Sequence, residues 1–301
     1  MIRASLVLIA ILLLSGCGGS SDAEQPLQVA VTNDDGVKAA GIAAMVDRLR
    51  QDPHLTVSVF APETNRSGTG DTITKSGTIT VQPAMTASGV TATSVRGTPA
   101  DSILFALTVA LPEPPDLVVS GINDGQNIGE LVYGPGLINS GTVGAALWAA
   151  RNGVPAIAVS QGSGATSVAE AADYVAGLVD RFRSDRSFHD QLLAGNVTGQ
   201  AIVLNVNFPT CASGGTRGVR VVPLGRSSRL TGYALSSESG DTKTYTPQVE
   251  TTNLFNSDCT STLANPATDV EAMNNGFASV TPLSTDVTLA GGLDRFRSLE
   301  R

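Results

Sequence analysis

Residues 27–36 read Leu-Gln-Val-Ala-Val-Thr-Asn-Asp-Asp-Gly, an apolar run that ends in a group of polar residues. The β-branched run from Leu27 to Thr32 predicts a strand. The next segment, Gly41 to Arg50, has apolar residues at helical spacing and predicts a helix. Two adjacent carboxylates, Asp34 and Asp35, therefore follow a strand and precede a helix.

The same alternation continues along the chain. Further strands are predicted at residues 56–61, 116–120, 156–160 and 201–207, and helices at residues 102–111, 140–151 and 168–183. Strands and helices that alternate with short connections are typical of α/β proteins, in which a mostly parallel sheet has helices on both faces. Ligands of such folds bind beyond the carboxyl ends of the strands, so the residues that directly follow each strand matter most.

After Pro209 the sequence becomes rich in Gly, Ser, Thr and Asn and has few long apolar runs. This composition predicts extended hairpins and loops with little core of their own. We therefore expect an α/β core over residues 27–210 and a peripheral extended β arm over residues 211–268. A C-terminal strand and tail over residues 269–301 should return to the core, because Gly276 to Leu289 is again β-type sequence.

The N-terminus has the features of a secretion signal. Arg3 precedes an apolar run from Ala4 to Leu14, which is too short to span a membrane and is followed by Leu14-Ser-Gly-Cys17. Leu-Ser-Gly-Cys resembles the bacterial lipobox, so residues 1–16 are expected to be removed, Cys17 to be lipidated and residues 17–26 to form a tether. The alternative is an ordinary signal with an unrelated cysteine. Either reading predicts export, and the lipobox predicts anchoring in the periplasm or at the outer membrane of a bacterium.

Charge and cysteine content limit the choice of partners. The formal net charge is −8 and no basic run occurs, which disfavours tight binding of a nucleic-acid polymer. Small phosphorylated substrates remain, since a metal ion can supply the local positive charge. If Cys17 carries lipid, Cys211 and Cys259 are left as a pair in an oxidising compartment and are expected to form a disulfide; two buried free thiols are the alternative.

Four polar segments follow predicted strands and should meet at one edge of a parallel sheet. They are Thr32-Asn-Asp-Asp-Gly36, Asn65-Arg-Ser-Gly68, Ser120-Gly-Ile-Asn-Asp-Gly125 and Asn139-Ser-Gly-Thr142. Asp34 and Asp35 would repel each other unless a cation neutralises them or one is protonated. A hard divalent ion, Mg²⁺ or Mn²⁺, prefers oxygen ligands, and Ser67 and Asn123 would complete its shell. An Asp-Asp-Gly that only makes a turn or caps a helix is the alternative.

Several residues around this set are candidates for binding a phosphate or the rest of a substrate. Ser140, Gly141 and Thr142 precede a strong helix, whose N-terminus attracts anions, although Ser140 or Thr142 could also be an ordinary N-cap. The candidate substrate-binding residues are Asn33, Asn65, Gly68, Ser140, Gly141 and Thr142. His54 and His189 lie outside the four segments, which argues against a Ser-His-Asp triad, a phosphohistidine or a His-rich zinc site.

The ordered set of motifs resembles the SurE survival-protein family. The resemblance rests on Val31-Thr-Asn-Asp-Asp-Gly36, Asn65-Arg-Ser-Gly68, Gly97-Thr-Pro-Ala-Asp101, Ser120-Gly-Ile-Asn123, Ser140-Gly-Thr-Val-Gly-Ala-Ala146, Leu204-Asn-Val-Asn207 and Gly276-Phe-Ala-Ser-Val-Thr-Pro-Leu283. It implies a Rossmann-like sheet and a divalent-metal phosphatase of nucleoside 5′- and 3′-monophosphates, with Asp34, Asp35, Ser67 and Asn123 at the metal-ligand positions. It also implies a C-terminal arm that helps build homodimers or tetramers.

Two regions depart from the family pattern. The segment Glu130 to Asn139 is longer than usual, and residues 211–265 differ from the usual arm. Two further functions therefore stay open: a broad acid phosphatase without nucleoside preference, and an anchored lipoprotein that binds nucleotide or phosphate without hydrolysis. For an enzyme, Asp34 or Asp35 would orient or deprotonate the attacking water. Retention of both carboxylates favours hydrolysis, because a binding protein could lose one and still hold phosphate.

Overall fold

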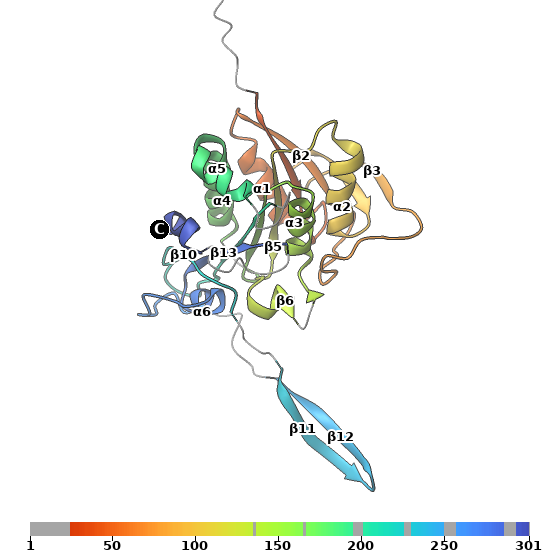
Figure 1. Ribbon diagram of the computed structural model, residues 1–301, viewed down its shortest axis with the longest axis vertical. Coiled ribbons are helices and arrows are strands. Elements are labelled where there is room, and N and C mark those ends of the chain that lie inside the picture. Colours follow the sequence, from red (N-terminus) through yellow and green to blue (C-terminus); the bar gives the residue numbers. More distant parts are fainter. Residues whose placement is uncertain are drawn as a thin grey trace, which may run out of the picture.

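The protein is built on one large sheet. The computed structural model describes residues 25–134, 137–164, 167–194, 201–225, 230–249, 257–285 and 293–300; the predicted signal, Cys17 and the tether as far as residue 24 lie outside them. The sheet strands are β1 (Leu27–Thr32), β2 (Leu55–Pro62), β3 (Thr80–Met85), β4 (Thr91–Arg96), β5 (Leu117–Asp124), β8 (Ala156–Gln161), β9 (Val203–Phe208), β10 (Val219–Val221) and β13 (Ala278–Leu283). Their order is β10-β13-β9-β8-β5-β1-β2-β4-β3 (Figure 1).

Most neighbouring strands run parallel. β1 pairs parallel with β2 and β5, and the run continues through β8 to β9. Within the described part of this nine-stranded sheet, only β3 against β4 and β13 against β9 are antiparallel. The predicted α/β fold class is therefore confirmed. In consequence, the segments after β1, β2 and β5 lie at the carboxyl edge of the sheet, whereas Leu27 enters it at the opposite edge.

Helices cover both faces of the sheet. They are α1 (Ala40–Leu49), α2 (Pro99–Phe105), α3 (Gly141–Arg151), α4 (Val168–Ser184), α5 (Arg186–Leu193) and α6 (Asp269–Asn274). Apolar side chains of α1, α4 and α5 pack with one face of the central strands into one buried cluster, and those of α2 and α3 pack into another on the opposite face. No helix among the described residues has both the length and the apolar surface needed to cross a membrane.

The helix predicted at residues 102–111 is different in detail. It begins earlier, at Pro99, because Thr98 and Asp101 form a capping box in which each side chain accepts the other's backbone N–H. It also ends as a π-helical turn, Ala106–Ala110, rather than as continuous α-helix. The signal for the earlier start is present in the sequence Thr-Pro-Ala-Asp, since proline is favoured in the first turn.

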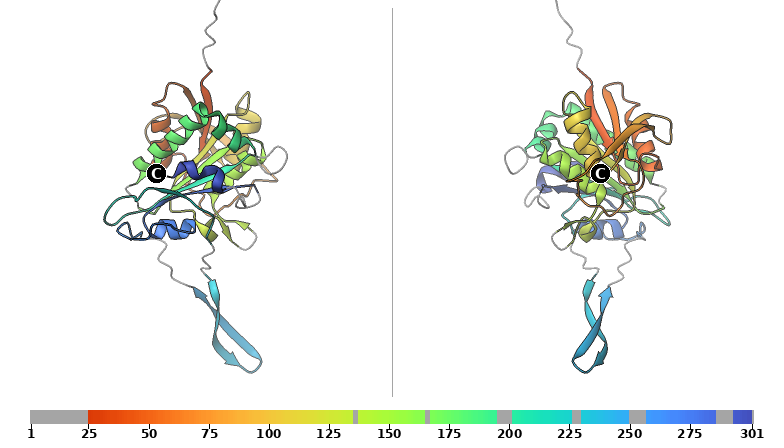
Figure 2. Two further views of the ribbon diagram at one scale, coloured as in Figure 1. Left: turned by 60° about the vertical axis from the view of Figure 1, so that its left-hand side comes forward. Right: turned by 90° about the vertical axis from the view of Figure 1, so that its right-hand side faces the viewer.

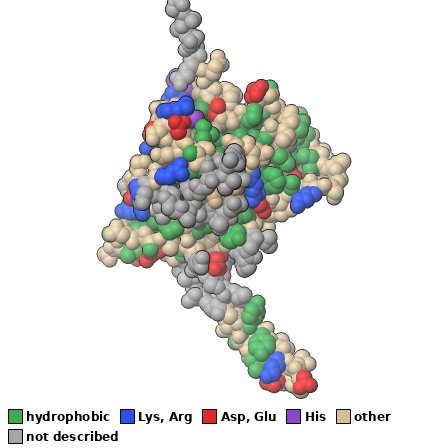
Figure 3. Space-filling view, in the orientation of Figure 1, with side chains coloured by type: hydrophobic (Ala, Val, Ile, Leu, Met, Phe, Trp, Pro, Cys, Tyr) green, Lys and Arg blue, Asp and Glu red, His purple; other side chains and the backbone are tan. Residues whose placement is uncertain are grey.

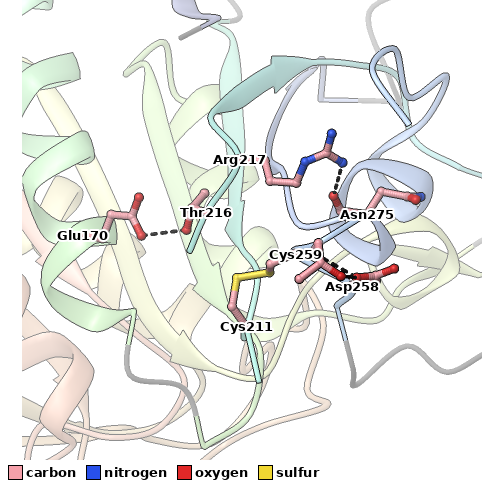
Figure 4. Close-up of a disulfide and its surroundings, with 8 residues drawn as sticks. Glu170, Cys211, Thr216, Arg217, Asp258, Cys259 and Asn275 are labelled. Atoms are coloured by element: carbon pink, nitrogen blue, oxygen red, sulfur yellow. Dashed lines mark hydrogen bonds between the residues drawn. A yellow bond between two sulfur atoms is a disulfide. The ribbon is translucent and has the colours of Figure 1, made fainter. Parts of the chain in front are cut away.

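The segment after β9 is divided between the main body and a separate hairpin. β10 joins the main sheet beside β13, and Cys211 and Cys259 form a disulfide with their Cα atoms 5.6 Å apart (Figure 4). Between the two cysteines in sequence, β11 (Leu230–Ser239) and β12 (Thr242–Val249) pair as an antiparallel hairpin that projects away from the body (Figure 2). The disulfide therefore closes the loop of chain that carries the hairpin.

Candidate active site at the carboxyl edge of the sheet

The turn after β1 brings two carboxylates to the edge of the sheet. Asn33 is buried and its Nδ2 donates to the carbonyl of Gly36 at 3.0 Å, while Gly36 adopts a φ of 101°, which favours glycine. Asn33 thus lies beneath the edge and shapes the turn. Helix α1 starts after Ala39, which makes no side-chain cap. Asp34 and Asp35 therefore do not cap helix α1.

Asp34 faces the N-terminus of α3. Its side chain is buried, and its Oδ1 accepts a hydrogen bond of 2.7 Å from Thr142 Oγ1. A Cβ placed on Gly141 would lie only 3.0 Å from Cβ of Asp34, so the helix approaches closely where it begins with glycine. Burial, together with the nearby carboxylate of Asp35, raises the pKa of Asp34 to about 6 although the Thr142 hydrogen bond lowers it.

Asp35 joins the segments after β2 and β5. Its Oδ1 accepts from Asn65 Nδ2 at 3.2 Å and its Oδ2 from the backbone N–H of Asp124 at 3.0 Å. Burial raises the pKa of Asp35, and the carboxylate of Asp124 acts in the same direction. Both oxygens of Asp35 are therefore held by N–H donors from two different strand ends.

The loop after β2 is fixed against the same turn. Asn65 Oδ1 accepts the backbone N–H of Ser67 at 2.9 Å, and the backbone N–H of Arg66 donates to the Asp34 carbonyl at 2.6 Å. Ser67 itself is exposed, and Gly68 turns the loop with a φ of 78°. Asn65 therefore orients both Asp35 and Ser67, while Ser67 keeps its hydroxyl at the surface of the site.

Asn123 contributes an amide oxygen from the end of β5. Its side chain is buried and its Nδ2 donates to the carbonyl of Gly125. With the nitrogen turned to the backbone, Oδ1 is the atom that is left to face a ligand. The following residue, Asp124, donates its N–H to Asp35, so Asn123 is tied to the carboxylates through the chain.

Ser140 and Thr142 both have structural partners at the start of α3. Ser140 is the N-cap, and its Oγ accepts the backbone N–H of Val143 at 3.1 Å, while Thr142 donates to Asp34. The N-cap interpretation therefore holds for the Ser140 hydroxyl. The N–H groups of Thr142, Val143 and Gly144 are directed to the Asp34 carboxyl and to Ser140. Phosphate binding at this helix would therefore use the Gly141 N–H and the favourable end of the helix dipole.

The donor set fits a hard divalent ion. Asp34 and Asp35 are adjacent acids whose charged forms are disfavoured by burial, a situation that a cation reverses. The described part of the chain contains no group of three or more His, Cys, Asp or Glu side chains that could hold a metal. His54 is exposed before β2 and His189 packs 4.7 Å from the ring of Phe182, so neither lies in these segments. Carboxylate, hydroxyl and amide oxygens suit Mg²⁺ or Mn²⁺.

A network of hydrogen bonds among asparagine side chains fixes the chain after Asn123. The sequence did not reveal this network. Asn127 receives hydrogen bonds on its carbonyl from Asn205 Nδ2 (2.8 Å) and Asn207 Nδ2 (3.0 Å), and its own side chain donates to Ser160 Oγ at 2.8 Å. Its backbone N–H also donates to Asn207 Oδ1 at 2.7 Å. The strand ends of β8 and β9 therefore hold the segment that links Asn123 to α3. These partners lie 33 to 80 positions apart in sequence, so no local pattern predicts them.

Asp269, the first residue of α6, also fixes nearby chain segments through hydrogen bonds that the sequence did not reveal. Its Oδ2 accepts the N–H of Gly129 at 2.9 Å, and its Oδ1 accepts those of Gly225 at 2.6 Å and Val270 at 2.8 Å. The carboxyl group is fully buried. It thus joins the segment after Asn127 to the residues that lead toward the hairpin. Burial raises the pKa of Asp269 to about 6, outweighing the three N–H donors.

We expect Asp269 to make the fold less stable as the pH rises from about 4 to about 6. Its pKa is about 6 in the folded protein and 3.8 without the fold, so between these values the folded state keeps a proton that the unfolded chain releases. This difference corresponds to about 3 kcal/mol. Urea unfolding across this pH range measures the effect. The free energy of unfolding should fall by about 3 kcal/mol less in Asp269→Asn than in the wild type.

The matched control for this variant is Asp258→Asn. Asp258 is exposed, and hydrogen bonds from Thr260 lower its pKa, so its replacement should not remove the fall in stability with rising pH. Identical pH profiles for the wild type and Asp269→Asn would contradict the expectation.

Comparison with known proteins gives a consistent result over nearly the whole chain. Residues 29–231 match the family described as "Survival protein SurE". The chain is 34% identical to a 5′-nucleotidase SurE of Symbiobacterium thermophilum, over 89% of this chain and 96% of the relative. It is 31% identical to that of Desulfovibrio desulfuricans, over 91% and 99% respectively. The crystal structure of a SurE protein from Aquifex aeolicus superimposes with a TM-score of 0.64 and 28% identity, covering 90% and 99% of the two chains.

Proposed function

The chain belongs to the SurE survival-protein family, and on that premise we propose that it is a divalent-metal-dependent phosphatase of nucleoside 5′- and 3′-monophosphates. The observation that carries the proposal is the meeting of four polar strand-end segments at one edge of the sheet, tied together through Asp34 and Asp35. The relatives of this chain named above are 5′-nucleotidases, and the match to the family, over residues 29–231, includes both carboxylates.

Asp34, Asp35, Ser67 and Asn123 are the residues proposed to hold the ion, which we expect to be Mg²⁺ or Mn²⁺. When bound, such an ion neutralises phosphate charge and makes a water molecule a better nucleophile. The Asn123 nitrogen donates to the Gly125 carbonyl, which leaves Oδ1 as the atom proposed to bind the ion. The Asn65 side chain hydrogen-bonds both the Ser67 backbone and the Asp35 carboxylate, and so fixes their relative positions.

The remaining steps fall to other groups of the chain. We propose that the start of α3, with the Gly141 N–H and the favourable end of the helix dipole, binds the phosphate oxygens together with the loop Asn65 to Gly68. Asp35 is held on both oxygens by N–H groups of two other segments, whereas Asp34 lies at the N-terminus of α3, where the phosphate is proposed to bind. Asp34 is therefore our choice for orienting or deprotonating the attacking water, which approaches phosphorus in line with the leaving alkoxide.

A phosphate-release assay tests this function. The purified protein is incubated with 5′-AMP, 5′-GMP, 3′-AMP and p-nitrophenyl phosphate, each with Mg²⁺, Mn²⁺ or EDTA. We expect the nucleotides to be hydrolysed faster than p-nitrophenyl phosphate and EDTA to abolish release. Equal rates on all four substrates would instead indicate a broad phosphatase. Nucleotide binding without any phosphate release would indicate a non-enzymatic binding lipoprotein.

We also propose that the protein is exported and anchored by lipid on Cys17. The lipobox-like sequence supports this, and so does the Cys211–Cys259 disulfide, because disulfides persist in oxidising compartments. Labelled palmitate should be incorporated into the wild-type protein in bacterial cells and not into Cys17→Ser. A wild-type protein that stays unprocessed and unlabelled would refute the anchor.

The hairpin is the surface that we propose for homodimer or tetramer formation. Tyr233 lies opposite Pro247, and Leu235 opposite Tyr245, so these side chains share one face. The exposed fractions are 64% for Tyr233, 49% for Leu235 and 52% for Tyr245, and apolar side chains gather on the hairpin in Figure 3. A lone two-stranded hairpin is at best marginally stable in water, which favours a second copy of this chain as its partner.

We expect Tyr233→Ser combined with Tyr245→Ser to weaken self-association, because both changes remove apolar area from the same face. Sedimentation velocity across a range of concentrations measures the effect. Thr246→Ser, on the opposite face of the hairpin, is the control and should sediment like the wild type. A double variant that keeps the wild-type oligomer would show that the hairpin face is not the interface.

A further inference from the structure

The loop of residues 65–71, which carries Ser67, packs against helix α3 at its far end. A Cβ placed on Gly144 of the helix would lie 2.3 Å from the carbonyl oxygen of Gly70, and a Cβ on Gly70 would lie 2.1 Å from that of Ile138. Only glycine permits these approaches of backbone to backbone. The loop is thus seated on the same helix whose first turn receives Asp34.

Two side chains in the last turns of α3 grip the far end of this loop. Trp148 Nε1 donates to the carbonyl of Asp71 at 2.6 Å, and Arg151 Nη1 donates to Asp71 Oδ2 at 2.8 Å. The Arg151 guanidinium also lies over the Trp148 ring, 5.5 Å from its centroid. The ion pair is half-buried, with 29% of the Arg151 side chain and 31% of that of Asp71 exposed. We call Asp71, Trp148 and Arg151 the α3 clamp.

The clamp closes a ring of contacts around the site. At one end of α3, Thr142 holds Asp34; at the other, Arg151 holds Asp71. The loop returns from Asp71 to Ser67 and Asn65, which reach Asp34 and Asp35 through the Arg66 N–H and the Asn65 side chain. Thr142 and Arg151 are nine positions, or about 13 Å of helix, apart. The helix therefore transmits the position of Asp71 to the catalytic end.

We infer that Trp148 and Arg151 are positioning residues for the reaction, acting through Asp71 to keep Ser67 and Asn65 in place beside the two carboxylates. This inference rests on the proposed function, since Ser67 is there a metal ligand. Residues that orient metal ligands from outside typically contribute 10- to 100-fold to metal affinity or activity. The clamp residues lie outside the four segments that are proposed to bind substrate and ion, so they would act through the loop.

The test compares Arg151→Gln with a matched ion-pair variant elsewhere, Arg181→Gln. Arg181 pairs with Asp185 at 3.1 Å, with 31% and 37% of the two side chains exposed, and its guanidinium lies 4.7 Å from the Phe188 ring centroid. It resembles Arg151 in all three respects but lies away from the loop. Arg151→Lys, which keeps the charge, is the second variant.

Three measurements on the full-length protein separate positioning from general stability. Calorimetric titration with Mn²⁺ should show a dissociation constant weakened about 10-fold in Arg151→Gln, with kcat/KM on 5′-AMP lowered by a similar factor. Acrylamide quenching of Trp148, the chain's single tryptophan, should increase. Arg151→Lys should recover part of each change, and Arg181→Gln should stay within about twofold of the wild type in all three.

The outcomes distinguish the clamp from the function on which it rests. If the wild type binds Mn²⁺ and releases phosphate, but Arg151→Gln and Arg181→Gln give equal Mn²⁺ affinity and equal quenching, the clamp inference is overturned and the proposed function stands. If the wild type itself neither binds Mn²⁺ nor releases phosphate, the proposed function fails and the clamp inference fails with it.

Discussion

Asp34→Asn is expected to lower kcat/KM on nucleoside monophosphates by about 10³-fold, the scale seen when one preorganised electrostatic group is removed from a reaction centre. The change removes a negative charge while Oδ1 can still accept the Thr142 hydrogen bond. Because burial disfavours the charged form of Asp34, the variant should be as stable as the wild type or more stable. Phosphate release and thermal unfolding, measured on the same preparations, check both expectations.

Two comparisons sharpen this experiment. Asp35→Asn should lower both activity and stability, because each oxygen of Asp35 accepts an N–H and the new amide would set a donor against one of them. Asp47→Asn, an exposed aspartate on α1 that accepts from Ser88, should change neither. Turnover close to wild type in Asp34→Asn, or in the wild type with EDTA, would end the proposal of a metal at this site.

Replacing Cys211 and Cys259 together by Ser is expected to lower the free energy of unfolding by about 4 kcal/mol. The disulfide joins residues 48 positions apart, and closing so long a loop removes much conformational freedom from the unfolded chain. Urea unfolding of the double variant measures the loss, and the wild type in a strong reductant should show the same one.

The serine variant also separates the fold from the site. Phosphate release at temperatures well below unfolding should stay near wild type, because the neighbours of the cysteines among the described residues are Gly214, Ser257 and Gly276, outside the four strand-end segments. A reduced wild type whose urea midpoint does not move would contradict the expectation, and so would a double variant with an unchanged midpoint.

The sequence predicted the central strands well because burial leaves a strong local pattern. β1 coincides with the predicted Leu27 to Thr32, and β8 and β9 agree within two residues. The prediction for β5 was too short: the strand runs to Asp124, so the polar segment that begins at Ser120 forms its last part rather than following it. β3 was missed, since Thr80–Met85 is an edge strand, mostly exposed and containing Pro83, and gives no apolar signal. α6 was missed too, although Thr268 caps it and the first turn is acidic, because it spans only six residues.

The site was predictable to the extent that topology brings strand ends together. Asp34, Asp35 and Asn65 meet because β1 and β2 run parallel, which the sequence implied. The contacts that hold the loop of Asn65 from outside the site were not predictable, since Asp71 and Arg151 lie 80 positions apart in sequence. Gly121 lies two positions before Asn123, in one of the four polar segments. In the structure a Cβ there would lie 2.1 Å from the Val159 carbonyl, so this glycine serves the approach of two strands.

If the protein is anchored by lipid at Cys17, the edge at which the chain enters the sheet determines which way the active site faces. Leu27 starts β1 at the edge of the sheet opposite to Asp34. The hairpin leaves the body on the side away from Leu27 (Figure 1). Ten tether residues reach at most about 35 Å when extended. With lipid on Cys17 and the hairpin as the interface between copies, both as proposed above, the enzyme would stand close to the bilayer with its active site turned away from it. Nucleotides would then arrive from the aqueous side, and the hairpins of neighbouring copies would meet beyond the reach of the lipid headgroups.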